Sequence, residues 1–246
     1  MAERHIKLTI EYDGTEFSGW QRQANAPTVQ QTIEEALAGM CHAPVILRGA
    51  GRTDAGVHAH GQVACFFTAS HIPVRGFVRG LNSVLPRSIG VRAGEEVAPD
   101  FDARRSARGK HYRYQVWNAE ERAPLVDRYA WHVITPLDDA AMRAGATHLL
   151  GEHDFSAFRA ADCDRKNPVR VLTRCDVVRS GDLITFDVEG TAFLKHMVRV
   201  IVGTLTEVGH GRRTPENIAE VLAGRDRTRA GRTAAPRGLT LFEVLY

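Results

Sequence analysis

The sequence predicts an α+β protein with two ferredoxin-like halves, residues 1–104 and 105–246. Two observations lead to this prediction. Apolar and polar residues alternate in some segments, which is typical of half-buried strands, whereas in others apolar residues recur every three or four positions, which is typical of helices. These segments also follow the order β-α-β-β-α-β once in each half. A duplicated α+β unit is the class that this repeated order favours.

The first half begins with a strand in which the apolar residues from Ile6 to Tyr12 alternate with polar ones. After a polar, glycine-rich loop, Thr28 and Gln31 have the spacing of a capping box at the start of a helix. The other elements are expected, in chain order, as strands at 45–51 and 61–67 with a loop at 51–60, a helix from Pro73 to Leu85, and a strand at 89–97.

The second half should contain a hairpin, because Ser180-Gly181-Asp182 separates two apolar runs. Thr135-Pro136 has the signature of a helix start and Gly151 that of its end. Residues 193–208 are apolar nearly all round, which predicts a buried helix. The remaining elements are expected as strands at 111–118 and 129–134, a loop at 151–170, hairpin strands at 171–178 and 183–190, a short helix at 217–222, and a strand at 238–246.

The composition excludes several classes of protein. Of the 246 residues, 43% are hydrophobic and 25% are charged, as in an ordinary globular chain, and the net charge is +3. No run approaches the roughly 18 apolar residues that a membrane-spanning helix needs, and the charged start lacks the apolar core of a secretion signal. The four cysteines form no C-x-x-C pair, so no disulfide framework is expected. These observations predict a protein of the reducing cytoplasm.

The segment from Gly51 to His58 is the strongest candidate for a catalytic site. It reads GRTDAGVH, with glycines that permit tight bends and close approach of a ligand. Arg52 lies two residues from Asp54, and a guanidinium beside a carboxylate favours its charged form. A fixed, charged carboxylate can act as a nucleophile or a base. The alternative is that Asp54 caps a turn, which is the common role of aspartate in such loops.

A metal site built from His58, His60 and Asp54 is a second hypothesis for this region. Metal sites need three or four converging ligands, and the sequence holds no H-E-x-x-H motif or Cys/His cluster. The sequence therefore favours the absence of a metal, with histidines that bind backbone groups.

A basic segment follows the expected division between the halves. Arg104, Arg105, Arg108 and Lys110 occur with no acidic residue among them, and Tyr112 begins a group of aromatic residues. Cations bind phosphates and aromatic rings stack on unpaired bases, so the pattern indicates contact with RNA. A solvated basic loop leading into a half-buried strand is the alternative.

Further arginines occur in the last third of the chain. Arg199 lies within the apolar helix expected at 193–208, where a buried guanidinium without a partner would be costly. We therefore expect that the guanidinium of Arg199 pairs with Asp54. The alternatives are a structural ion pair with another residue, or a side chain that extends to reach solvent. The arginine-rich segment 225–237 is expected to be a mobile surface loop that could also contact phosphates.

Together these motifs resemble the bacterial tRNA pseudouridine synthase A (TruA) family. The resemblance is carried, in chain order, by EYDGTEFSGWQRQ, GRTDAGVHA, FDARRSARGKHYRY, DFSAFRA, FLKHMVRVIVGTL and GLTLFEVLY. These segments span nearly the whole chain, and GRTDAGVHA is highly specific. The resemblance implies one large mixed, mainly antiparallel sheet with helices on one side and a central catalytic cleft.

The resemblance also implies a reaction and roles for four residues. Family members isomerise uridine to pseudouridine at positions 38, 39 and 40 of the tRNA anticodon stem-loop, by base flipping, as homodimers, without a cofactor or catalytic metal. Asp54 matches the catalytic aspartate, and Arg52 matches the arginine that places the flipped nucleotide. Tyr112 matches the tyrosine that stacks on the target base, and Arg199 matches the basic residue that pairs with the aspartate. Whether Asp54 attacks C6 of the base or C1′ of the ribose stays open, and neither DNA nor a membrane is an expected partner.

A non-catalytic RNA-binding module is the alternative from a different class. It would use the same basic and aromatic residues. It gives no reason, however, for the GRTDAG loop or for Arg199 within an apolar helix.

Overall fold

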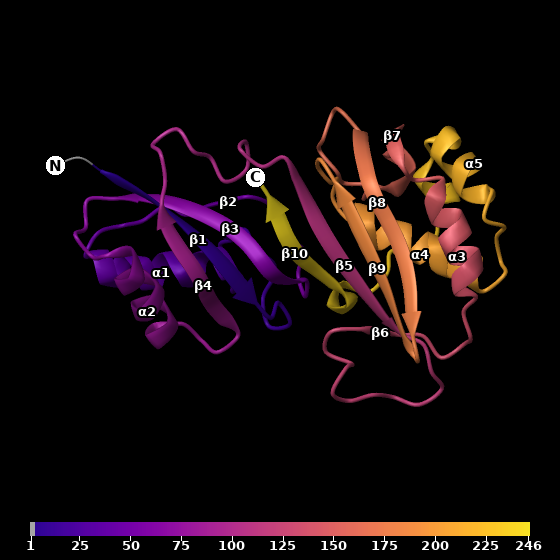
Figure 1. Cartoon of the computed structure of the whole chain (residues 1–246), viewed down its shortest axis with the longest axis horizontal. Helices are drawn as coiled ribbons and strands as arrows, with labels where there is room; N and C mark the ends of the chain where they lie inside the picture. Colours follow the sequence, from indigo (N-terminus) through magenta and orange to yellow (C-terminus); the bar gives the residue numbers. More distant parts are fainter. Residues whose placement is uncertain (1–2) are drawn as a thin grey trace. The chain divides into compact units, whose positions relative to one another are not determined.

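The chain folds into two compact units in the computed structural model, which describes residues 3–246. The first unit comprises the chain up to Arg108 together with Leu241–Tyr246, and the second comprises Gly109–Thr240. Both units contain strands and helices, so the predicted α+β class is confirmed. Figure 1 labels the elements of both units.

The first unit has the predicted order β-α-β-β-α-β. Its strands follow the order β4-β1-β3, and the short β2 pairs with β3. The pairings of β1 with β3, of β1 with β4 and of β2 with β3 are all antiparallel, with Leu8 opposite Ala64 in β3 and Gly94 in β4. The elements are β1 (Arg4–Tyr12), α1 (Val29–Cys41), β2 (Arg48–Gly49), β3 (His58–Thr68), α2 (Val74–Val84) and β4 (Ile89–Glu96).

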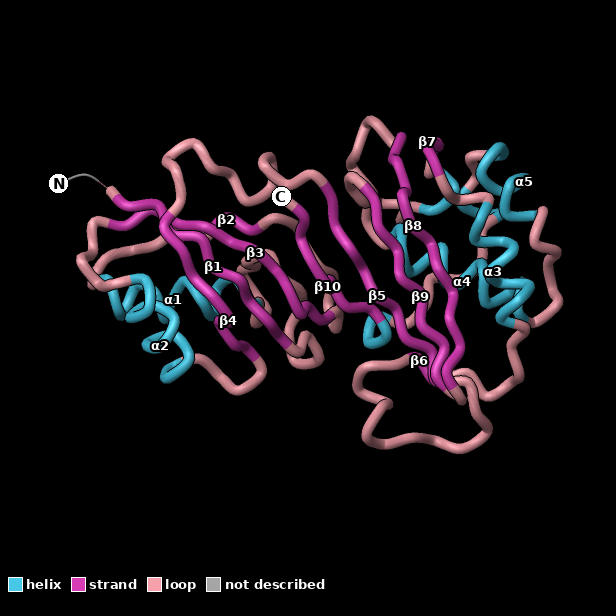
Figure 2. The backbone as a smooth tube through the Cα atoms, in the orientation of Figure 1, coloured by secondary structure: helices cyan, strands magenta, loops and turns pink. Residues whose placement is uncertain are grey.

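Both helices of the first unit lie on the same side of its strands (Figure 2). The alternation predicted for β1 is confirmed, because its apolar side chains are completely buried while the residues between them are mostly half-buried. Thr28 caps α1, since its side chain accepts a hydrogen bond from the backbone nitrogen of Gln31. The fully buried side chains shared by β1 and the two helices are Ile6, Leu8, Ile10, Ile33, Leu37, Phe77 and Leu81.

The last strand, β10 (Leu239–Leu245), carries the end of the chain into the first unit. It lies next to β3 in the sheet order. The ring of Phe242 stacks on that of His60 with centroids 5.0 Å apart, and the Tyr246 hydroxyl donates to the carbonyl of Ala103. Leu241–Tyr246 therefore group with the first unit, where Phe242 and Tyr246 contact His60 and Ala103, although the sequence pattern placed them in the half 105–246.

The second unit combines four antiparallel strands and one short additional strand with three helices. Its strands follow the order β5-β9-β8-β7, all antiparallel, and β6 pairs parallel with β5. The predicted hairpin is confirmed, with Gly181 at its turn in the left-handed region. The elements are β5 (Gly109–Trp117), β6 (Trp131–His132), α3 (Asp139–Thr147), β7 (Gly151–Asp154), β8 (Val169–Ser180), β9 (Leu183–Gly190), α4 (Met197–Gly209), α5 (Asn217–Gly224), and 3-10 turns at Ser156–Phe158, Arg227–Arg229 and Pro236–Gly238.

Two predicted strands are shorter in the structure. Residues 45–51 contribute only the two residues of β2, because both backbone groups of Leu47 bind side chains of α1. Its nitrogen donates to Glu34, and its carbonyl accepts from Gln30. The strand expected at 129–134 is reduced to the two residues of β6.

Three predicted boundaries were wrong in the second unit. The helix expected from Thr135 begins only after Asp138, since Asn118 binds the backbone of the preceding residues and Asp138 caps the helix. The loop expected at 151–170 contains β7, which pairs with β8, and a 3-10 turn. The buried helix begins at Met197 rather than at 193, because His196 adopts a left-handed conformation.

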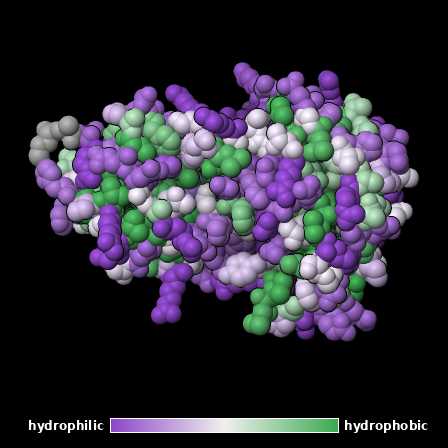
Figure 3. Space-filling model, in the orientation of Figure 1, coloured by the Kyte–Doolittle hydropathy of each residue, from purple (hydrophilic) through white to green (hydrophobic). Residues whose placement is uncertain are grey.

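The surface is mostly hydrophilic on the face shown in Figure 3. An exception is the long loop between β5 and β6, where Leu125 is 95% exposed. Within residues 3–246, no helix is both long enough and apolar enough to cross a membrane.

Candidate functional site

The loop that carries Asp54 is fixed by its own backbone and by the residues next to Asp54. The carbonyl of Thr53 accepts a hydrogen bond from the nitrogen of Trp20 at 3.1 Å, and the carbonyl of Asp54 accepts one from the nitrogen of Val57, also at 3.1 Å. The Thr53 hydroxyl lies 2.7 Å from that of Tyr12. Because Thr53 and Val57 are buried, the backbone on either side of Asp54 has little freedom.

Two glycines allow the loop 13–20 to approach the Asp54 loop directly. At Gly19, where φ is +95°, a Cβ would lie 2.5 Å from the carbonyl oxygen of Thr53. At Gly14, a Cβ would lie 2.0 Å from the carbonyl oxygen of Val57. Any larger residue at either position would force the two backbones apart, which explains why this glycine-rich loop accompanies the GRTDAG motif.

Two buried polar side chains, Tyr12 and Gln62, form hydrogen bonds with the loop that carries Asp54. Tyr12 is 2% exposed, and burial raises the pKa of its hydroxyl far above the usual value, although hydrogen bonds with Thr53 and Gln62 partly oppose this. The side chain of Gln62, itself fully buried, donates to the carbonyl of Gly51 at 2.9 Å. These contacts tie both β1 and β3 to the residues that precede Asp54.

The side chains of Arg52 and Asp54 reach the surface, unlike those of their buried neighbours Thr53 and Val57. Asp54 is partly exposed and Arg52 is exposed. The Nε atom of Arg52 donates to the side chain of Gln21 at 3.1 Å, which orients the guanidinium against the loop 13–23. The structure thus holds Arg52 and Asp54 on one rigid loop and leaves both accessible to a ligand.

The two histidines of the proposed metal site have other contacts. His58 is buried, with its Nδ1 atom 3.1 Å from the nitrogen of Gly14 and 3.2 Å from a carboxylate oxygen of Asp13. His60 is exposed and stacks on Phe242. Both lie in β3 rather than in the expected loop. Within residues 3–246, no three His, Cys, Asp or Glu side chains are grouped so that they could hold a metal ion.

Tyr112 and Arg199 belong to the second unit, on β5 and α4. Tyr112 is 7% exposed, and its ring packs edge-on against that of Phe193, with centroids 4.9 Å apart. Arg199 is half-buried, and its Nε atom donates to the carbonyl of Ala234 at 2.8 Å. The backbone nitrogen of Ala234 donates in turn to the carbonyl of Arg199. The backbone carbonyl of Ala234 is thus one partner of the Arg199 side chain. The pairing of Arg199 with Asp54 stays a prediction.

The basic segment after residue 103 is an exposed turn. The carboxylate of Asp102 accepts hydrogen bonds from the backbone nitrogens of Arg104 and Arg105, at 2.9 and 2.8 Å, and these bonds lower its pKa. The side chains of Arg104, Arg105 and Arg108 are exposed, and Lys110 is half-buried. This turn offers three accessible guanidinium groups, as the sequence pattern requires for contact with RNA.

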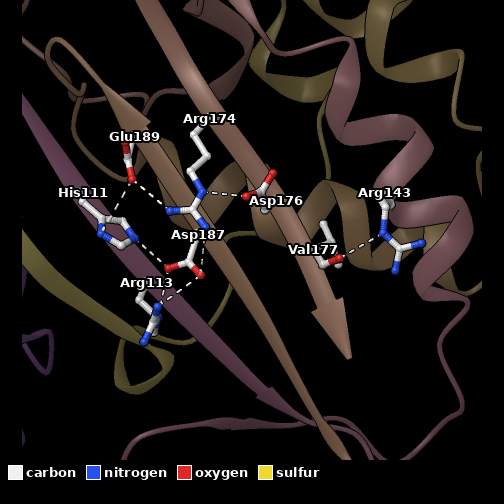
Figure 4. A network of polar contacts seen from close by, with 8 residues as sticks. All are labelled: His111, Arg113, Arg143, Arg174, Asp176, Val177, Asp187 and Glu189. Carbon is white, nitrogen blue, oxygen red and sulfur yellow. Dashed lines mark hydrogen bonds and ion pairs between the residues drawn. The ribbon is translucent and has the colours of Figure 1, made fainter. Parts of the chain in front are cut away.

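A network of ion pairs covers one face of β5, β9 and β8 (Figure 4). Asp187 is 6% exposed and receives hydrogen bonds from His111 at 2.6 Å and Arg113 at 2.9 Å. Burial by itself would raise the pKa of Asp187, but the hydrogen bonds from Arg113 and His111 hold it below the usual value. Arg174 binds Glu189 and Asp176 beside it. Arg113, a further basic residue three positions after Lys110, is therefore partnered within the fold.

Several residues of the site were missed by sequence reasoning. Tyr12, Thr53 and Gln62 look like ordinary members of a strand or a turn, and their polar groups meet only after β1 and β3 have paired. The one available signal for Gln62 is a polar residue in an apolar run, which calls for a buried partner. His111 and Asp187 are similarly separated in sequence and are joined by the pairing of β5 with β9.

Comparisons with known proteins agree with the resemblance drawn from the motifs. The family model described as tRNA pseudouridine synthase matches residues 8–104 and 146–246. The tRNA pseudouridine synthase A of Myxococcus xanthus is 54% identical over 98% of this chain and 91% of its own length. Those of Geotalea uraniireducens and Geobacter sulfurreducens are 49% and 48% identical, over 99% of this chain and 100% of their own lengths.

The family model and these relatives define an isomerase that acts on RNA. The chain belongs to the tRNA pseudouridine synthase family. Its reaction class is therefore the isomerisation of uridine in tRNA.

Proposed function

We propose that this enzyme converts uridines at positions 38, 39 and 40 of the tRNA anticodon stem-loop to pseudouridine, with Asp54 as the nucleophile or base. The observation that supports Asp54 most is the rigid loop that presents its side chain, because a reacting carboxylate must be held within a short reach of its target. The structural alternative, a turn-capping aspartate, would not need Thr53, Gly14 and Gly19 to fix the surrounding backbone on both sides.

The chemistry needs only one carboxylate, because the uracil stays in the site throughout. The bond between C1′ and N1 breaks, the base turns, and a bond between C1′ and C5 forms with loss of the C5 proton. Asp54 would start this sequence either by attack at C6 of the base or by action at C1′ of the ribose. The carboxylate of Asp54 or a water molecule then takes the C5 proton, and N1, freed from C1′, ends the reaction protonated.

The other proposed roles concern the target nucleotide. A base inside a stem must be flipped out before it can react, at a cost of a few kcal/mol. Tyr112 would stack on the flipped base, Arg52 would place its nucleotide, and Arg199 would pair with Asp54. The exposed edge of the Arg52 guanidinium and the aromatic packing of Tyr112 suit these roles.

Binding energy from remote phosphates can offset the cost of flipping. We propose that the exposed side chains of Arg104, Arg105 and Arg108, with Lys110, supply part of it. The working enzyme would be a homodimer that binds tRNA and neither DNA nor membrane. We also propose that the enzyme acts in the cytoplasm, since its proposed substrate is tRNA.

The test of Asp54 combines turnover with binding. Asp54→Asn keeps the shape of the side chain but removes its charge, so it should fold, bind tRNA with near wild-type affinity and abolish pseudouridine formation. Asp54→Glu moves the carboxylate by about 1 Å, and such a displacement can cost on the order of a hundredfold in rate. Tritium release from C5-labelled uridine in tRNA measures turnover, and filter binding at fixed salt measures affinity.

The outcomes of this experiment distinguish a catalytic Asp54 from the alternative roles. Substantial turnover by Asp54→Asn would remove Asp54 from the chemistry. Loss of binding in step with loss of turnover would mark it as a structural turn residue. A wild-type protein that binds tRNA without releasing tritium would instead be a binding module.

The role of the basic turn is tested by salt dependence. A protein that neutralises several phosphates loses affinity linearly in log salt, with a slope of about −0.9 per contact for duplex nucleic acid. Replacing Arg104, Arg105 and Arg108 by Ala should therefore reduce the magnitude of the slope for tRNA by up to about three. An unchanged slope would show that the turn is a solvated loop.

A further inference from the structure

Residues 231–234, within the arginine-rich segment 225–237, are held against α4 by hydrogen bonds. Four hydrogen bonds hold them, of which two join Arg199 and Ala234 in both directions. The nitrogen of Gly231 donates to the Thr204 hydroxyl at 2.9 Å, and the nitrogen of Arg232 donates to Glu207 at 3.3 Å. The expected mobile loop is thus wrong for residues 231–234, because backbone groups of this segment are bound to a buried helix. A fixed backbone presents its side chains in defined places.

Arg232 is the exposed residue of the segment 231–234. Its guanidinium carbon lies 4.6 Å from the centroid of the Trp131 ring, a cation–π distance. Trp131 is 9% exposed and packs perpendicular to Tyr114, so its position is set by the core. Within the described chain, residues 3–246, no carboxylate lies at ion-pair distance from the Arg232 guanidinium. The cation is therefore oriented by an aromatic ring, and its N–H groups are not used by an acidic partner.

Arg232 lies among other arginines of the same unit. Burial raises the pKa of Tyr114, and the positive charges of Arg199, Arg237 and Arg232 partly oppose this rise. Burial lowers the pKa of His210, and Arg212 and Arg232 lower it further. The backbone nitrogens of Arg212 and Arg232 both donate to Glu207, so these two residues are also neighbours through their direct contacts with Glu207.

The acidic groups near these arginines only partly balance them. Asp127 forms an ion pair with Arg237 at 3.3 Å, with both side chains more than 40% exposed. Glu207 is bound to Arg213 as well as to the backbone of Arg232. Arg232 and Arg212 therefore contribute positive charge that no acidic side chain of residues 3–246 neutralises by direct contact. An anion is the ligand that such a surface fits.

We propose that Arg212, Arg232 and Arg237 form an arginine track that binds the phosphodiester backbone of the tRNA, with Arg232 as its central contact. The planar guanidinium can donate two parallel hydrogen bonds to a phosphate while its face stays on Trp131. The track lies beside Arg199, so phosphates bound there would belong to RNA close to the reacting nucleotide. The proposal rests on the proposed function, because the track is assigned to the same substrate.

The test measures tRNA affinity as a function of salt for Arg232→Ala. Loss of one phosphate contact should reduce the magnitude of the slope of log K against log salt by about one. Affinity at fixed moderate salt should fall at least about tenfold, because one charge-assisted contact to a phosphate is lost. In steady state the Michaelis constant for tRNA should rise, whereas kcat should stay near the wild-type value.

Arg143→Ala is the matched control. Arg143 is an exposed arginine of the same unit. Its side chain donates to the carbonyl of Val177 (Figure 4) and also forms an ion pair with Asp139. Removing it changes the net charge by the same amount, so its salt slope should match that of the wild type. A slope reduced equally by Arg143→Ala would show that only net charge matters, which would overturn the proposal.

Two further outcomes decide the case. Arg232→Lys keeps the charge but not the planar fork, so it should recover the salt slope while recovering only part of the affinity. Unchanged slope and affinity in Arg232→Ala, measured beside a wild type that releases tritium, would refute the track and leave the proposed function intact. A fall in kcat with unchanged tRNA affinity would also overturn it, since Arg232 would then act on the chemistry.

Discussion

The hydrogen bond between Tyr12 and Thr53 can be broken without changing the shape of either side chain. Tyr12→Phe and Thr53→Val each remove one hydroxyl from a pair that is 2.7 Å apart and 2% and 7% exposed. Each single change leaves the other hydroxyl buried without this partner, which costs about 1–3 kcal/mol in the free energy of unfolding. The double change leaves no hydroxyl of this pair without its partner, but buried Gln62 still loses its bond to Tyr12, so the cost should stay near that of one single change.

The double variant should therefore be about as stable as the single variants, rather than showing the sum of their losses. The expected coupling between the two positions is on the order of 1 kcal/mol or more. Urea unfolding followed by near-ultraviolet circular dichroism measures all three variants. Thr9→Val, a change of the same type on β1 at a half-buried position, should alter stability by less than about 0.5 kcal/mol.

The same pair should affect catalysis, because Thr53 directly precedes Asp54. Loosening the loop by about 1 Å can lower the rate on the order of a hundredfold. We expect kcat to fall in both single variants while tRNA affinity stays near the wild-type value. Additive losses of stability, together with unchanged kcat, would refute the argument that this buried pair positions Asp54.

Three further predictions follow from other contacts. Asp187→Asn should cost about 1.5–3 kcal/mol at neutral pH, because it removes charged hydrogen bonds to His111 and a partly exposed Arg113. The pKa of Asp187 is lower in the folded protein than in the unfolded chain, where it is about 3.9, so its charged form stabilises the fold fully above that pH. This stabilisation is lost as the pH falls through the folded pKa. Acid unfolding should therefore show the loss in the wild type and less of it in Asp187→Asn. Asp138→Ala should destabilise α3 by about 1 kcal/mol in thermal or urea unfolding, since it removes the cap on Ala141, and a change below 0.3 kcal/mol would show that the cap is dispensable. Arg199→Met should abolish tritium release, and Arg199→Lys should restore it only in part because a point charge lacks the planar fork; full activity in either variant would remove Arg199 from the site.

The sequence by itself determined the features that depend on short-range chemistry. The alternation in β1 reflects one buried face of a strand. The Thr28 cap and the Gly181 turn depend on residues within three positions of each other. The GRTDAG loop was also recognisable, because a glycine-flanked carboxylate with a nearby arginine is a local pattern.

Only the tertiary structure decided the features that depend on pairing between distant segments. β7 exists because β8 lies beside it, and the end of the chain joins the first unit because it lies next to β3. The partners of Arg113 and of the segment 231–234 come from β9 and α4. Such contacts could not be predicted from the sequence alone, because one polar side chain can satisfy its hydrogen bonds with many partners, and the fold selects which of them are within reach.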